Sequence, residues 1–224
     1  VEDDKGMARR FHLPLASEAH VAITVQREGN ELRYRLLYPE LLPSDEAFGL
    51  LVHTRGKVIR NEALSRYAPS GTLSCDSLPE GITHFAIYNK DTVVVSERLV
   101  FVRQPDPVFQ LTSSRLPDEG RMPIKMGLRL VDQDLRPLQG NFSLSVTDDY
   151  AVTVHEERQN LLSYLLLSSD LRGPIHNPGY YLTGETEEIT RHTDQLMLTH
   201  GWRRYDVTAR NNGTVRNDTV YGIE

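Results

Sequence analysis

In residues 21–38 the apolar side chains recur at every second position, on both sides of the pair Gly29-Asn30. This pattern predicts a β-hairpin with one buried face. Further short apolar runs, separated by Gly, Pro and Asn turns, continue to about residue 102. We therefore predict about seven strands in an antiparallel sandwich of immunoglobulin type over about residues 10–103. Its core should include Val21, Ile23, Val25, Leu36, Phe85 and Ile87.

A second group of strands is predicted after the sequence Pro105-Asp106-Pro107. Proline restricts itself and the residue before it to extended backbone, so this is the best place for a domain boundary. Alternating patterns at 124–130 and 142–147, with short runs at 108–112 and 151–154, predict about four strands. Four strands close no sandwich by themselves, so their apolar face needs a cover. The expected organisation is one sandwich at 1–104, a second unit at 105–207, and a linker or edge strand at 208–224.

The longest apolar run of the chain lies between Leu161 and Leu167. It places apolar groups on nearly every face of a helix, and such helices are normally buried on several sides. Seven residues cannot cross a bilayer, which needs roughly 20. We expect a buried helix over 161–171 that covers the four-stranded unit. A second helix is predicted from about Thr193 to Gly201, with the Thr193 hydroxyl as its N-terminal cap.

Aromatic residues gather in the same part of the chain. The turn sequence Asn177-Pro178-Gly179 should present Tyr180 and Tyr181, and Trp202 and Arg203 follow the second predicted helix. Two interpretations are open for Tyr180, Tyr181 and Trp202, because the rings could form a ligand platform or pack in the core and at its rim. With Arg203 they are the candidate interaction surface of this sequence.

The composition of the 224 residues is that of a soluble globular protein, with 39% apolar and 25% charged residues. A net charge of −6 without a basic stripe argues against a nucleic-acid partner. The single cysteine, Cys75, excludes an internal disulfide and a cysteine zinc site. The polar first ten residues cannot form a signal peptide, so either the protein is cytosolic or a leader has been removed. We expect the chain to be a piece of a longer protein.

The motifs of known catalytic sites are missing from the sequence. It contains no G-x-S-x-G elbow, no phosphate loop and no dinucleotide glycine fingerprint. The eight histidines are scattered, and no two stand at the i, i+4 spacing that binds zinc on a helix. Asp132 with Asp134, and Asp148 with Asp149, could bind Ca²⁺, although Asp in turns usually serves local hydrogen bonds. We expect no catalytic residue, no cofactor and no metal.

Several segments carry a family likeness. The segments LPEGITHFAIYN, SERLVFV and IKMGLRLVDQDLRPLQGNFSLSVTDD, with SYLLLSSDLRGPIHNPGYY and LMLTHGWRRYDV, resemble the macroglobulin-like domains of Bacteroides-type exported multidomain proteins. The likeness covers about residues 15–207. It implies a mainly β protein with two macroglobulin-like sandwiches, the second incomplete and covered by a short helical segment. It also implies a downstream carboxypeptidase-regulatory-like domain, a TonB-receptor-type plug, and a place in the cell envelope, at the periplasm or outer membrane.

One feature of macroglobulins is missing. Their thioester uses a CGEQ-type motif, whereas Cys75 stands in Ser74-Cys75-Asp76-Ser77 without a following Glu-Gln pair. No thioester can form, and Cys75 is expected to be a small buried hydrophobe.

Three functions are compatible with the sequence. The first is a non-catalytic structural and protein-interaction module of an outer-membrane-associated protein. The second is a module that binds glycan or peptide through Tyr180, Tyr181 and Trp202, and the third is a hydrolase with dispersed residues. The expected partners are other domains of the same chain and an envelope protein or peptide. We expect no nucleic acid and no membrane-spanning segment.

Overall fold

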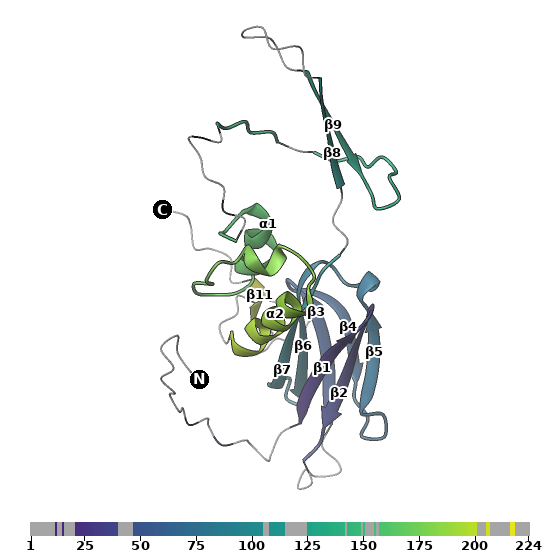
Figure 1. Cartoon of the computed structure of the whole chain (residues 1–224). Coiled ribbons are helices and arrows are strands. Elements are labelled where there is room, and N and C mark those ends of the chain that lie inside the picture. Colours follow the sequence, from purple (N-terminus) through teal and green to yellow (C-terminus); the bar gives the residue numbers. More distant parts are fainter. Residues whose placement is uncertain are drawn as a thin grey trace.

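A computed structural model of the chain describes most of its length. The described residues are 12, 15, 21–39, 47–104, 108–114, 125–141, 143–148, 150, 155, 157–200, 205–206 and 216–217. Within them the fold is mainly β, with antiparallel sheets and few helices, as the sequence predicts (Figure 1).

Two antiparallel sheets form a sandwich. The first has the order β1-β2-β5 and comprises β1 (Ala22–Glu28), β2 (Glu31–Leu37) and β5 (Ser70–Ser74). The second has the order β4-β3-β6-β7 and comprises β3 (Phe48–Thr54), β4 (Lys57–Ala63), β6 (Gly81–Asn89) and β7 (Val94–Val102). The hairpin β1–β2 turns at Gly29, whose φ of 61° is the left-handed conformation that glycine adopts without strain. A short 3₁₀ turn, η1 (Cys75–Ser77), follows β5.

The two sheets share one apolar core. Side chains from β1, β2 and β5 pack there against β3, β6 and β7, and all six predicted core residues are buried. Cys75 is 2% exposed within the same core, so its prediction as a buried hydrophobe is confirmed.

The outer face of the second sheet is also buried. Nearly every residue of β3 and β6 is shielded from water, which is the pattern of a strand covered on both sides. The covering chain is residues 161–200, here called the helical cover. It comprises α1 (Leu161–Ser163), the π-helical turn η2 (Tyr164–Ser168), the 3₁₀ turn η3 (Tyr180–Leu182) and α2 (Glu187–Thr199).

Among the described residues, the helical cover packs on the first sandwich and not on the second predicted unit. Its buried residues Leu167, Leu171 and Met197 join Ile82 of β6 and Leu99 of β7 in a second apolar cluster. The sequence prediction that this stretch covers residues 105–154 is therefore wrong. The outer face of the four-stranded sheet carries the apolar side chains Ile82, Leu99 and Phe101, and the leucines of the cover bury their surface against these.

The apolar run is buried on one side only. Leu166, Leu167 and Leu171 are buried, whereas Leu161 is 74% and Leu165 is 49% exposed. The expected helix over 161–171, buried on several sides, is replaced by one α-helical turn continued as a π-helical turn. Only the residues that face the sheet lose contact with water.

The second helix begins earlier than predicted. Its N-terminal cap is the Thr186 side chain, which accepts a hydrogen bond from the Ile189 amide, and Glu187 and Glu188 occupy its first turn. Acidic side chains are favourable at a helix N-terminus, where the helix dipole is positive. Thr193 lies in the middle of α2, where its hydroxyl donates to the Ile189 carbonyl.

In the described residues of the second unit the strands form one hairpin, β8 (Val108–Ser114) with β9 (Lys125–Val131). Figure 1 shows this hairpin standing apart from the sandwich. A strand was predicted at 142–147, but the described residues 143–148 form none, and Leu144 and Val146 are 70% and 81% exposed. The predicted strand at 151–154 lies outside the described residues. The alternating pattern suits a strand, but a strand also needs a neighbour with which to pair.

The C-terminal part contributes one short pair of strands, β10 (Tyr205–Asp206) with β11 (Arg216–Asn217). The second strand lies within the range where an edge strand was predicted. No helix of the described residues is long and apolar enough to cross a membrane.

Candidate binding groove

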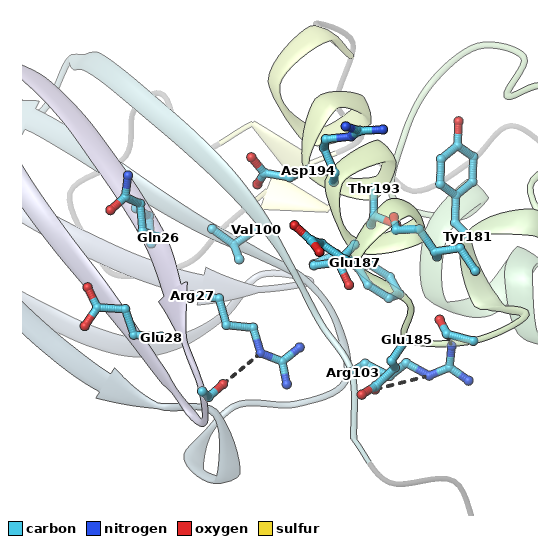
Figure 2. Close-up of a pocket in the computed structure, with 17 residues that line it drawn as sticks. Gln26, Arg27, Glu28, Val100, Arg103, Tyr181, Glu185, Glu187, Thr193 and Asp194 are labelled. Atoms are coloured by element: carbon cyan, nitrogen blue, oxygen red, sulfur yellow. Dashed lines mark hydrogen bonds and ion pairs between the residues drawn. The ribbon is translucent and has the colours of Figure 1, made fainter.

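A groove with a cavity of about 670 Å³ lies at the open side of the sandwich. Both strands that border it, β1 and β7, are at the edge of their sheets. The third wall is the helical cover, through Tyr181, the turn at 184–185 and the first half of α2. Figure 2 shows β1, β7 and α2 converging on this space. Within the part of the chain that the structure describes, the groove therefore lies where two unpaired sheet edges meet one helix.

The floor of the groove is apolar. Val25 and Val100, which are nearly fully buried in the sandwich core, reach it from β1 and β7. Phe101 and Tyr181 reach it from the second apolar cluster, and Ile189 comes from the first turn of α2. A bound side chain would find an apolar surface continuous with both clusters.

The rim carries charges of both signs. Arg27, Glu28, Glu187 and Arg191 stand around the opening, and Figure 2 shows Arg27 and Glu28 on one wall opposite Glu187 on the other. Arg27 is held by a hydrogen bond of 3.1 Å from its Nε to the Gly29 carbonyl. A rim with charges of both signs favours a ligand that has donors, acceptors and charges along its length.

Arginines of β7 and of the segment after it fasten the cover beside the groove. Arg98 forms an ion pair with Asp194 of α2 and donates to the Leu99 carbonyl at 2.8 Å. Arg103, whose side chain is 13% exposed, donates to the Leu182 carbonyl at 2.9 Å, and its Nε lies 3.9 Å from a Glu185 oxygen. These contacts hold the helical cover at a fixed distance from β7.

The structure brings one predicted site residue into the groove. Tyr181 lines the groove. Its hydroxyl has a raised pKa, mainly because the ring is partly buried and to a smaller extent because Tyr180 lies beside it. Tyr180 is turned toward α2, where its hydroxyl lies 2.8 Å from His192 Nδ1. The two tyrosine rings meet edge to face at 5.4 Å. Trp202 and Arg203 lie outside the described residues, so their part in the surface stays a prediction.

Most of the lining was not found from the sequence. The end of β1 looks like any hairpin strand, and nothing local shows that it is an edge that faces β7. The start of α2 did carry a signal, because Thr186 followed by two glutamates is a typical helix N-terminus. Ile189, Leu196 and Met197 then recur at helical spacing.

A second polar feature lies within the four-stranded sheet. His53 of β3 and His84 of β6 are register partners, and their rings stack with centroids 4.4 Å apart. His84 Nδ1 lies 2.8 Å from a Glu97 oxygen. His53 has no hydrogen-bond partner at either ring nitrogen. Burial is the main cause that lowers the pKa of His53 to about 3, and the nearby His84 ring is the second cause. The His53 ring is therefore neutral in this environment.

The described residues offer limited chemistry. Stacked imidazoles do not converge on one point, and no group of three or more His, Cys, Asp or Glu among the described residues could hold a metal ion. Burial raises the pKa of the Cys75 thiol, which keeps it protonated and unreactive. The groove can bind and position a ligand and can exclude water from it.

No protein-family model matches the chain. No curated protein matches it in sequence either.

Proposed function

We propose that this chain is a non-catalytic protein-interaction module that binds an extended peptide segment in the groove between β1, β7 and the helical cover. The observation that carries the proposal is the position of the groove at the edges of both sheets. Within the described chain β1 pairs only with β2, and β7 only with β6. An edge strand presents unpaired backbone N–H and C=O groups, which an extended peptide can use.

The lining suits a peptide along its whole length. Alternate side chains of a strand point to opposite sides, so one set would contact the apolar floor while the other faces the charged rim. Val25 and Phe101 lie on the floor, and Arg27 and Glu187 on the rim. Tyr181, a residue of the interaction surface expected from the sequence, lines this groove together with the edges of the sandwich.

A glycan is the second candidate ligand, and the tyrosine geometry favours a peptide over it. Stacking of a sugar needs a flat aromatic face that is free on one side. The Tyr180 ring meets Tyr181 at 77° and its hydroxyl is hydrogen-bonded to His192, so the pair forms no continuous platform.

The setting of the module is also a proposal. The resemblance to macroglobulin-like domains of exported proteins supports a place in the cell envelope, attached to further domains of the same polypeptide. Fractionation of the full-length protein from its native cells tests this, with the outer-membrane or periplasmic fraction as the expected place. Recovery in the cytosolic fraction would overturn it.

Peptide binding is tested with a displayed library of random extended peptides, followed by calorimetry on the selected sequences. Thr190 is an exposed residue of α2 that lines the groove, so Thr190→Trp should fill the space and weaken binding at least tenfold. Gln195 is an equally exposed residue of the same helix that does not line the groove, and Gln195→Trp is the matched control with unchanged affinity. Failure to select any peptide, or equal affinities for all three proteins, would refute the proposal.

A further inference from the structure

The interface between the second sheet and the helical cover contains polar groups without partners. His53 is fully buried, and both its ring nitrogens lack a hydrogen bond. His84 is 1% exposed and its Nε2 also lacks one. A buried polar group without a hydrogen-bond partner is destabilising, and here two such rings lie side by side.

These rings lie on the face of the sheet that the cover protects. His84 is the register partner of both His53 and Leu99, and Leu99 packs against Leu167 and Met197 of the cover. The sandwich core lies on the opposite face, with Phe85 and Ile87. Water therefore reaches the two imidazoles when the cover moves away, while the sandwich core stays closed.

The charged groups around the pair are already engaged. On β7, Glu97 bonds to His84 Nδ1. In the cover, Asp170 is 1% exposed and accepts a 3.1 Å hydrogen bond from Arg55 Nε, while Arg55 Nη2 donates to the Leu165 carbonyl at 2.7 Å. On β4, the register partner of His53 is the apolar Val58. Glu97 and Asp170 are thus bonded to other groups, and neither is placed to accept a hydrogen bond from the His53 ring.

We propose that the His53–His84 stack is an acid-sensitive clasp, in which protonation of His53 releases the helical cover from the four-stranded sheet. A charged imidazolium at this position would be buried, unpaired and stacked on a second imidazole. Opening of the cover hydrates it. The closed state therefore requires the neutral ring.

The direction of the effect follows from the pKa of His53, which the closed structure lowers to about 3 from 6.5. Stability of the closed state is fully present above pH 6.5 and is lost as the pH falls from 6.5 toward 3. At pH 5 the closing equilibrium constant should be up to about 30-fold smaller than at neutral pH. Burial raises the pKa of Asp170, which acts in the opposite direction and moderates the loss.

The clasp does not depend on what the groove binds. Its consequence for the groove does rest on the proposed function, because Tyr181 and Ile189 belong to the cover and form one wall. Acidification would then move this wall of the groove away and release a bound peptide.

Hydrogen exchange measured by mass spectrometry between pH 7.5 and 5, corrected for intrinsic rates, tests the clasp without any ligand. Peptides from 161–172 and 187–199 should lose protection by up to about 30-fold at pH 5, while peptides from β2 and β5 keep theirs. His53→Phe retains a stacking ring, and His53→Gln retains a neutral polar side chain. Both should abolish the pH dependence, whereas His176→Phe, at an exposed histidine of the cover, should leave it intact.

Three results would overturn the clasp: cover protection in the wild-type protein that does not change with pH, a pH dependence that persists in both His53 variants, or equal loss in β2 and β5. Should the variants fail to fold, the ring nitrogens of His53 are titrated by nitrogen-15 NMR in the wild-type protein. Titration near 6.5 with the cover closed would then contradict the clasp. Peptide binding is measured separately, so a silent groove with a pH-sensitive cover rejects the proposed function and keeps this inference.

Discussion

Two leucines of the same helical turn provide a sharp test of how the cover is held. Leu167 is fully buried against Ile82 and Leu99, whereas Leu165 is 49% exposed. Leucine to alanine removes the equivalent of about three methylene groups, or about 2.4 kcal/mol of transfer free energy at roughly 0.8 kcal/mol each. At Leu167 a cavity term is added, so Leu167→Ala should cost about 3–4 kcal/mol, within the usual 2–5 kcal/mol. At Leu165 about half of the transfer term applies and solvent fills the space, which gives about 1 kcal/mol.

The assay is urea unfolding followed by circular dichroism, combined with hydrogen exchange of peptides from 161–172. Exchange is needed because the cover could open before the sandwich unfolds, and a single transition would then not report its stability. A smaller change in protection for Leu165→Ala than for Leu167→Ala is expected. Equal costs, or a larger cost at Leu165, would refute the assignment of the sheet-facing side of the cover.

Three further predictions concern the contacts that shape the cover and the sandwich. Arg55→Met removes the ion-pair partner of the buried Asp170 carboxylate and should cost about 1–3 kcal/mol at pH 7, below the usual range for buried pairs because Arg55 is one-third exposed. Urea unfolding at pH 7 and pH 4 should show a smaller loss of stability at pH 4, where Asp170 is protonated more readily. An equal loss at both pH values would speak against the pair. Thr186→Ala removes the α2 cap and should cost about 1 kcal/mol, visible as faster exchange at the start of α2, with Thr199→Ala at the far end as the control. Gly49→Ala places a methyl group against the Tyr88 ring and should lower the melting temperature. Gly184→Ala is the control, because its methyl group makes only an ordinary contact with Ile189 and should leave the melting temperature unchanged. Similar melting temperatures for both variants would contradict the packing of β3 on β6.

The sandwich could be predicted from the sequence because its signal is local. The alternation at 21–38 fixes which side chains of β1 and β2 are buried, and Gly29 supplies the turn between them. The same reasoning failed for the cover, because an apolar run indicates burial without naming the surface against which it packs. That surface did leave a trace, since β3 and β6 carry no Asp, Glu, Lys or Arg on either face, a composition typical of strands that are covered on both sides.

The groove and the histidine pair depend on distant parts of the chain. His53 and His84 are 31 positions apart in the sequence and meet only through the register of β3 with β6. Likewise, Val25, Phe101 and Ile189 meet only after the sandwich forms and α2 docks on it. Tyr181 was chosen from the sequence as an aromatic in a turn, and its place in the groove could not be inferred without the strand order.

The central claim is that an extended peptide binds along the edges of β1 and β7 beneath α2. The most direct measurement is nitrogen-15 and methyl NMR of the protein titrated with a peptide selected from the library. Binding in the groove should produce chemical-shift changes and intermolecular Overhauser contacts at 25–29, at Val100 and Phe101, and at Ile189 and Thr190. Contacts confined to the exposed leucines of 161–165, or to the apolar side chains of the β8–β9 hairpin, would place the interaction elsewhere and contradict the claim.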